Sequence, residues 1–116
     1  MKEKVAEEKK PLLSIIMPCY NMETTLVRAI DSILMQKVDF EYEVIIVDDA
    51  STDKTLEIST AYAQKDKRIH VIKNKKNEGN AKSFYVGLCN ARGDYFCVLD
   101  GDDFYTIKNK FQKQIE

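Results

Sequence analysis

Short apolar runs alternate with helix-patterned segments along most of this sequence of 116 residues. The runs at 12–17, 43–47, 69–72 and 95–99 have the length and the β-branched or aromatic content of buried strands. The segments that follow the first three runs carry apolar residues at helical spacing, which predicts helices ending near residues 36, 64 and 91. This alternation predicts an α/β fold: a three-layer sandwich whose mostly parallel sheet has helices on both faces.

Net charge and length exclude several classes of protein. A formal net charge of −1 gives no basic surface for nucleic acid or for an anionic membrane. No apolar run approaches the roughly 20 residues that span a bilayer, so we expect no membrane segment in this chain and a cytoplasmic location. Three cysteines without metal-ligand spacing predict buried free thiols. Residues 1–10 are almost wholly charged and predict a flexible N-terminal arm, with the folded domain beginning at residue 11.

Polar residues follow three of the predicted strands, in loops 18–21, 48–53 and 100–103. Ligands of parallel α/β sheets bind outside the carboxyl ends of the strands, so these loops are expected to form one crevice. The ring of Tyr20 can stack on a base, and Asp49 can accept a hydrogen bond from a base N–H. Asn21 or a neighbouring threonine is available to cap the first helix.

Three carboxylates, Asp100, Asp102 and Asp103, crowd into four positions after the last apolar run. Because like charges repel, a bound divalent cation would stabilise such a group, and oxygen ligands favour Mg²⁺ or Mn²⁺. A cation there would also offset the charge of a departing nucleoside diphosphate. The alternative is an acidic turn that caps the following helix.

Five motifs in order resemble family 2 glycosyltransferases of the GT-A fold: Pro18-Cys19-Tyr20-Asn21, Val47 to Asp53, Asn77-x-Gly79, Gly93-Asp94-Tyr95 and Leu99 to Asp103. The resemblance implies a Rossmann-like nucleotide-binding half over residues 11–116. It further implies an inverting transfer of a sugar from a nucleotide-sugar donor, usually a UDP-sugar, to an acceptor hydroxyl of a glycan or glycoconjugate. Mn²⁺ or Mg²⁺ would be the cofactor, and polysaccharide biosynthesis the setting.

The resemblance also implies a role for each matching residue. Pro18, Cys19 and Tyr20 would form the uridine-contacting loop, and Asp49 would recognise the base, whereas Asp48 would be structural. Asp100 would lie near the donor ribose or sugar, and Asp102 would bind the metal with help from Asp103. The full set expected to bind nucleotide-sugar is Pro18, Cys19, Tyr20, Asn21, Asp49, Asp100, Gly101 and Asp102.

The sequence departs from the family at Phe84-Tyr85, where the family often has Arg-Asn, and we expect both rings in the core. His70 is expected on the surface of a strand. The family domain is about twice as long, and its later half supplies the acceptor site and the acceptor-activating base, which is therefore expected beyond Glu116. We expect an inactive donor-binding half, truncated inside a helical pattern, whose missing contacts expose apolar surface and favour a homodimer or poor solubility. Parts outside this chain could hold the protein at the inner face of the membrane.

Three alternatives are considered. A sugar nucleotidyltransferase usually has a glycine-rich basic loop after its first strand, and none follows Met17. A phospho-acceptor receiver domain needs an aspartate after the third strand, but residues 74–77 contain no acid. A non-catalytic nucleotide-binding or assembly module of the same fold would leave the acidic motif without a role.

Overall fold

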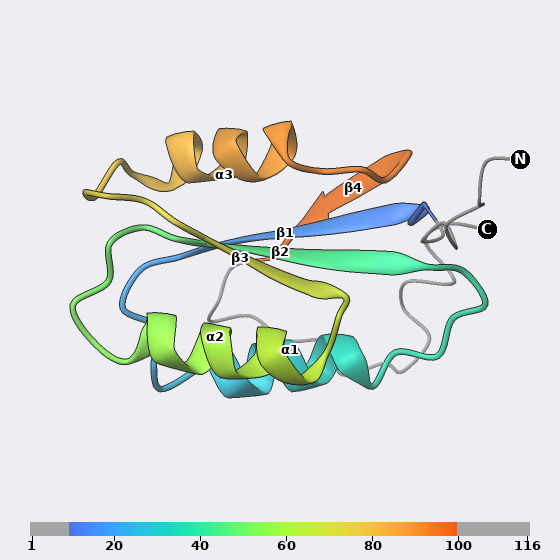
Figure 1. Cartoon of the computed structure of the whole chain (residues 1–116), viewed down its shortest axis with the longest axis horizontal. Coiled ribbons are helices and arrows are strands. Elements are labelled where there is room, and N and C mark those ends of the chain that lie inside the picture. The colour runs from blue at the N-terminus through green and yellow to red at the C-terminus, as the bar shows by residue number, and fades with distance from the viewer. Residues whose placement is uncertain (1–9, 100–116) are drawn as a thin grey trace, which may run out of the picture.

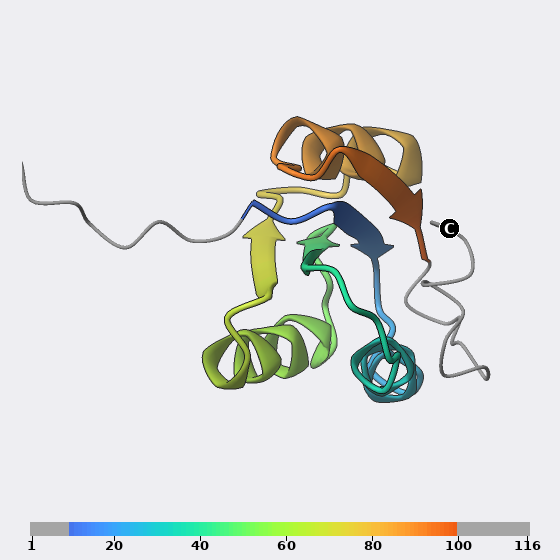
Figure 2. The ribbon, with the colours of Figure 1, turned by 90° about the vertical axis from the view of Figure 1, so that its right-hand side faces the viewer.

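The computed structural model describes residues 10–99, which form a sheet of four strands with helices on both faces. Figures 1 and 2 show three layers, with α3 above the sheet and α1 and α2 below it. The elements in chain order are β1 (Leu13–Cys19), α1 (Leu26–Leu34), β2 (Tyr42–Asp48), α2 (Thr55–Lys65), β3 (Ile69–Lys73), α3 (Asn80–Cys89) and β4 (Tyr95–Val98).

The described strands are all parallel and lie in the order β3-β2-β1-β4. Each connection crosses through a helix, as parallel neighbours require. The predicted α/β three-layer sandwich is therefore confirmed. The order places β1 and β2 in the middle and brings their carboxyl ends, Cys19 and Asp48, into register with one another.

The sequence pattern predicts that the first strand ends before Pro18. This prediction is wrong. Pro18 lies inside β1 and is in register with Val47. The pairing of β1 with β4 extends to Ile16, so within residues 10–99 Pro18 has a neighbouring strand on one side alone. A sheet tolerates proline where one side of the strand is unpaired, because the missing N–H then leaves no partner unsatisfied.

The larger core lies between the sheet and the layer of α1 and α2. Alternate residues of β1 and β2 point into it and meet the apolar stripe of α1. Its buried members are Leu13, Ile15, Met17, Cys19, Leu26, Ala29, Ile30, Ile33, Tyr42, Val44, Ile46, Ile69 and Leu99. This layer fixes both central strands from below.

Helix α3 packs closely on the opposite face of the sheet because it carries a glycine there. A Cβ at Gly87 would lie 2.6 Å from Ile16 Cγ2 and 3.2 Å from Val47 Cγ2. Helix α1 begins without the predicted side-chain cap: Thr25 precedes its first turn but makes no capping hydrogen bond. The Asn21 side chain is used elsewhere, as described below.

Predictions of burial are wrong in β4 and α3. Residues 95–98 form a strand, but Tyr95, Phe96 and Val98 are each about half exposed, because β4 lies at an edge of the sheet that the described residues form. Tyr85, expected in the core, is 64% exposed, and Phe84 is partly buried against the ring of Phe96.

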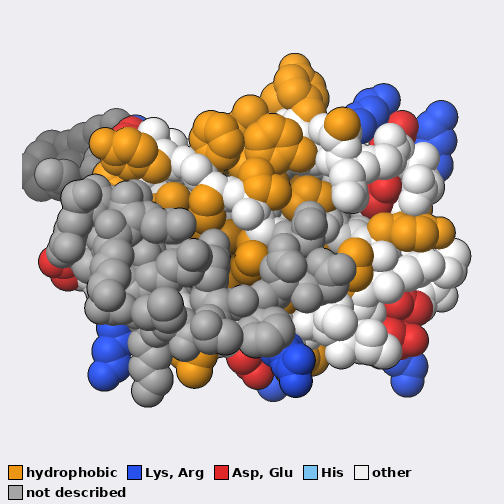
Figure 3. Space-filling model, turned by 180° about the vertical axis from the view of Figure 1, so that it is seen from behind, with side chains coloured by type: hydrophobic (Ala, Val, Ile, Leu, Met, Phe, Trp, Pro, Cys, Tyr) orange, Lys and Arg blue, Asp and Glu red, His pale blue; other side chains and the backbone are white. Residues whose placement is uncertain are grey.

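Together, Phe84, Tyr85, Phe96 and Val98 form an aromatic surface over α3 and β4. Figure 3 shows hydrophobic side chains gathered on this part of the molecule. The three cysteines are free thiols as predicted, although Cys89 is exposed and Cys97 is only partly buried.

Within residues 10–99, no helix is long and apolar enough to cross a membrane. The predicted N-terminal arm and the acidic motif lie at least partly outside the described residues. Lys10, the last residue of the predicted arm, pairs with Asp94 at 2.8 Å.

Candidate functional site

The loops after β1 and β2 are joined by hydrogen bonds at the carboxyl edge of the sheet. The Asn21 N–H donates to Ser51 Oγ at 3.0 Å, and the Met22 N–H donates to Thr55 Oγ1 at 2.7 Å. The Asn21 side-chain oxygen accepts from the backbone N–H of Thr52 at 2.8 Å and of Asp53 at 3.3 Å. Asn21 therefore satisfies donors just before α2, and its carbonyl is committed to this bracing.

Both loops contain a residue in the left-handed backbone region. Asn21 has φ 53° and Ala50 has φ 60°. Asparagine adopts this region more readily than alanine, so the strain at Ala50 must be held by its surroundings. The Asp49 N–H donates to the Cys19 carbonyl at 2.8 Å, and the Ser51 N–H donates to Asp48 Oδ2 at 3.3 Å. These bonds hold the turn on both sides of Ala50.

Asp49 is buried at the end of β2 and faces the loop between β3 and α3. Its Oδ1 accepts from Asn74 Nδ2 at 2.9 Å and from the Glu78 N–H at 2.7 Å. Its Oδ2 accepts from the Gly79 N–H at 2.8 Å. Burial alone would raise the pKa of Asp49, but hydrogen bonds from Glu78, Asn74, Gly79 and Ser83 outweigh it and hold this pKa below its usual value. Asp49 is therefore an ionised carboxylate that organises loop 74–79.

Asp48, equally buried, is in a different environment. Its Oδ2 accepts only the long bond from Ser51, and among the described residues its Oδ1 is a buried oxygen with no hydrogen-bond partner. Alternation along β2 places it on the face of α1 and α2, opposite to Asp49. This agrees with the expectation that Asp48 is not the base-recognising carboxylate, although its role stays a prediction.

Of the predicted nucleotide-binding residues, Tyr20 and Asn21 are exposed, whereas Cys19 is fully buried and Pro18 lies within β1. Tyr20 is 39% exposed, and the side-chain oxygen of Asn21 is already bonded to the N–H groups of Thr52 and Asp53. The Cys19 thiol donates to the Met17 carbonyl at 3.5 Å. A ligand at this edge of the sheet would meet the Tyr20 ring and the backbone of the loops, but not the side chains of Pro18 and Cys19.

The remaining predicted site residues, Asp100, Gly101, Asp102 and Asp103, lie outside the described residues. Residues 10–99 contain no group of three or more histidine, cysteine or acidic side chains placed to hold a metal ion. The assignment of Asp102 and Asp103 as metal ligands therefore stays a prediction.

Two residues of the site escaped sequence reasoning. Asn74 donates to Asp49 and also to Ser83 Oγ at 3.0 Å, and Ser83 is fully buried. Neither belongs to a motif that we recognised, and Asn74 lies 25 positions from Asp49. Only the fold brings them together.

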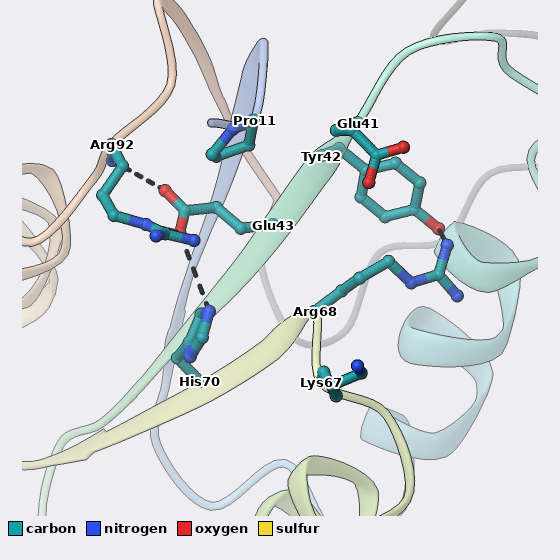
Figure 4. A pocket seen from close by; sticks show the side chains of 8 residues that line it. All are labelled: Pro11, Glu41, Tyr42, Glu43, Lys67, Arg68, His70 and Arg92. Carbon is teal, nitrogen blue, oxygen red and sulfur yellow. Dashed lines mark hydrogen bonds and ion pairs between the residues drawn. The ribbon is translucent and has the colours of Figure 1, made fainter. Parts of the chain in front are cut away.

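A cavity of about 240 Å³ lies at the other end of the sheet, beside the amino ends of the strands (Figure 4). Its walls include Glu43, Arg68 and Arg92, whose charges are paired with one another or with Asp66. We place the candidate site at the carboxyl edge, because ligands of parallel α/β sheets bind there.

The described residues thus form a parallel α/β sheet with Tyr20 and the ionised Asp49 at its carboxyl edge, where proteins of this fold class bind their ligands. The family model Glycosyl transferase family 2 matches residues 14–116. The chain therefore belongs to glycosyltransferase family 2.

Several curated relatives are similar over most of this chain. A glycosyltransferase of Haemophilus influenzae is 44% identical over 105 residues, which are 90% of this chain and 41% of that protein. TuaG of Bacillus subtilis, whose name refers to teichuronic acid biosynthesis, is 41% identical over 107 residues, or 92% of this chain and 42% of TuaG. The chain thus spans about two-fifths of the length of these relatives.

Solved structures share the fold. S. aureus TarS in complex with UDP-GlcNAc has a TM-score of 0.77 and 34% identity, covering 89% of this chain and 29% of TarS. The mannosyltransferase PcManGT from Pyrobaculum calidifontis, in complex with GDP-Man and Mn²⁺, has a TM-score of 0.76 and 25% identity, covering 86% and 30%. The GT-A architecture of this chain is therefore that of the matching part of these enzymes.

Proposed function

We propose that this chain is the donor-binding half of an inverting, metal-dependent glycosyltransferase that uses a nucleotide-sugar, with UDP-sugar as the expected donor. The observation that carries the proposal is the exposed Tyr20 ring, held by the braced Asn21 loop at the same edge of the sheet as the ionised Asp49. The UDP-GlcNAc complex of TarS supports the choice of donor by analogy.

Tyr20 would stack on the base, since every base has a π-face and Tyr20 is an exposed aromatic residue next to the braced Asn21. Asp49 would contact the base N–H or hold the loop beside it. An ionised carboxylate accepts about four hydrogen bonds, and the β3–α3 loop already supplies several. A base N–H would therefore share or replace one of these donors.

The acidic motif would provide the metal-dependent part of donor binding. Asp102 and Asp103 are the expected ligands of Mn²⁺ or Mg²⁺, with Asp100 and Gly101 beside the donor. Bound there, the cation would stabilise the negative charge of the leaving diphosphate. The complex of PcManGT with Mn²⁺ supports this choice of cofactor by analogy.

The acceptor site and the base that activates the acceptor hydroxyl would come from sequence beyond Glu116. The chain alone is therefore expected to bind donor without transferring sugar to a glycan or glycoconjugate acceptor. In the whole protein we expect a cytoplasmic domain, at the inner face of the membrane, that builds surface polysaccharide. The match to TuaG, with its name referring to teichuronic acid biosynthesis, supports that setting.

The test is a calorimetric titration of UDP into the chain with and without Mn²⁺. Tyr20→Ala and Asp102→Asn are compared with Tyr85→Ala, a matched control because Tyr85 is also exposed but lies on α3. We expect UDP binding to weaken about tenfold or more in Tyr20→Ala, its dependence on Mn²⁺ to be lost in Asp102→Asn, and both to be kept in Tyr85→Ala. Equal binding by all variants, or sugar transfer by the chain alone, would contradict the proposal.

A further inference from the structure

Strand β4 has no apolar–polar alternation that would fix its register. Every residue from Tyr95 to Leu99 is apolar or aromatic, and β4 exposes side chains of both faces. Register is weakly specified in a strand whose two faces are alike, because a slip would expose side chains of the same apolar kind as those already exposed. A specific contact must therefore hold β4 beside β1.

Such a contact lies just before β4, around the buried carboxylate of Glu43 (Figure 4). Glu43 Oε2 accepts from Ser14 Oγ at 2.6 Å and from the Arg92 N–H at 2.7 Å. Glu43 Oε1 accepts from Arg92 Nε at 3.4 Å, and His70 Nε2 lies 3.7 Å away. Hydrogen bonds from β1 and from the loop before β4 thus converge on one side chain of β2.

Ser14 and Gly93 complete this contact. Ser14 Oγ donates to Glu43 and accepts from the Gly93 N–H at 2.9 Å. A Cβ at Gly93 would lie 2.7 Å from Ser14 Oγ and 2.8 Å from Ser14 N, which are closer than real Cβ contacts allow. Only glycine lets the chain come this near to β1. We call Ser14, Glu43, Arg92 and Gly93 the Glu43 clasp.

The buried, charged carboxylate of Glu43 needs the hydrogen bonds of the Glu43 clasp to be in place. Burial would raise the pKa of Glu43, but hydrogen bonds from Ser14 and Arg92 outweigh it and lower this pKa. A buried carboxylate that loses such donors carries a large desolvation cost. A shifted β4 would impose that cost, whereas the backbone ladder of β4 alone could form again after a slip.

The Glu43 clasp fixes the amino end of β4, and the backbone hydrogen bonds to β1 then fix the position of its carboxyl end. The Tyr95 N–H donates to the Leu12 carbonyl at 2.9 Å, and the Leu99 N–H donates to the Ile16 carbonyl at 3.0 Å. Asp100 follows Leu99 directly in the sequence. A slip of two residues would displace this point by about 6.6 Å, at about 3.3 Å per residue.

We propose that Glu43 is a positioning residue: the Glu43 clasp sets the register of β4 on β1 and thereby the position of Leu99, the residue that precedes the acidic motif in the sequence. The register of β4 is independent of function, while the consequence for the acidic motif rests on the proposed function. Glu43 acts from the opposite end of the sheet and touches no ligand.

Hydrogen exchange of single amides, followed by NMR on the 116-residue chain, tests the register. In Glu43→Ala we expect the Tyr95 and Leu99 amides to exchange about 10- to 100-fold faster relative to amides in the middle of β2. Glu43→Gln, whose carbonyl can still accept from Ser14 and Arg92, should retain most of the protection. Gly93→Ala should behave like Glu43→Ala, because its Cβ has no space.

Tyr42→Phe is the matched control. Tyr42 precedes Glu43 on β2 but faces the other layer. The variant loses the hydrogen bond that the hydroxyl accepts from Arg68, at 2.9 Å, and the one that it donates to the Ile33 carbonyl, at 3.4 Å. The relative exchange at Tyr95 and Leu99 should not change in this variant. If Tyr42→Phe accelerates these amides as much as Glu43→Ala does, the role of Glu43 is general stability and the proposal is wrong.

The second readout is the gain in UDP affinity that Mn²⁺ gives. We expect Glu43→Ala to lose most of this gain in affinity, and Glu43→Gln to keep most of it. An unchanged gain together with faster exchange would overturn the link to the acidic motif. If the unsubstituted chain shows no effect of Mn²⁺, the proposed function fails, while the exchange data still decide whether the Glu43 clasp sets the register.

Discussion

Replacing Asp49 by asparagine is expected to lower the free energy of unfolding by about 3 kcal/mol. The amide keeps one oxygen, which can still accept from Asn74 and the Glu78 N–H, but its NH₂ group would face the Gly79 N–H that now donates to Oδ2. Losing a buried hydrogen bond to a charged group costs roughly 1.5–3 kcal/mol, and the bonds that remain become weaker with a neutral acceptor. The expected loss is a large part of a total stability of about 5–15 kcal/mol.

Asp48→Asn provides the matched control, because the two aspartates are adjacent and each is 1% exposed. Among the residues that the structure describes, Asp48 accepts one long hydrogen bond, and its other oxygen has no partner. Removing its charge therefore breaks little and relieves a buried carboxylate of part of its desolvation cost. We expect a change of less than about 1 kcal/mol, in either direction.

Urea unfolding followed by circular dichroism measures both variants. The pKa of folded Asp49 lies below its ordinary value of 3.8, so its stabilising contribution is present above that pH and is lost as pH falls through the folded pKa. The difference between the unsubstituted chain and Asp49→Asn should therefore shrink below about pH 3.8. Equal losses in the Asp48 and Asp49 variants, or a difference that is independent of pH, would refute the assigned role of the Asp49 hydrogen bonds.

Three further outcomes are expected. Tyr20→Ala should weaken UDP binding about tenfold or more, since stacking contributes about 1–3 kcal/mol per base, and should leave the urea midpoint unchanged. Gly87→Ala should lower the midpoint, because a Cβ 2.6 Å from Ile16 Cγ2 costs about 1–3 kcal/mol of overpacking against about 1 kcal/mol gained in helix propensity; an unchanged midpoint would contradict the close packing of α3. The exposed apolar edge predicts self-association into a homodimer or larger species, so Phe96→Lys should reduce the mass seen by light scattering, whereas Val27→Lys on α1 should not.

The order and type of the elements followed from the sequence because two periodicities are unambiguous in it. Residues 44–47 form a continuous apolar run and became the middle of the central strand β2, while Leu26, Ala29, Ile30 and Ile33 became the buried face of α1. Burial in β4 and α3 was not predictable in the same way. An apolar run indicates a strand, but only the strand order shows that β4 has a neighbour on one side.

The site was predictable in place more than in contacts. The rule that ligands bind at the carboxyl edge identified the loops of Tyr20 and Asp49. The hydrogen-bond partners of Asn21 and Asp49 were not predictable from the sequence. Asn21 bonds to Thr52 and Asp49 bonds to Asn74, in each case across more than 20 positions. The local sequence favoured Asn21 as a helix cap, but its side chain instead accepts a hydrogen bond from Thr52, which is distant in the sequence.

The two edge strands of the described sheet differ in how readily they can pair with a further strand. Strand β3 exposes His70 and Lys73, and a charged side chain hinders the pairing of a further strand, whereas β4 carries no charged residue from Tyr95 to Val98. A strand joining this sheet, from whatever polypeptide, is therefore expected beside β4. Each strand added there increases the distance of β1 and the Tyr20 loop from that edge of the enlarged sheet. A monomeric, soluble version of this chain is best sought by placing charges on β4 and leaving β3 as it is.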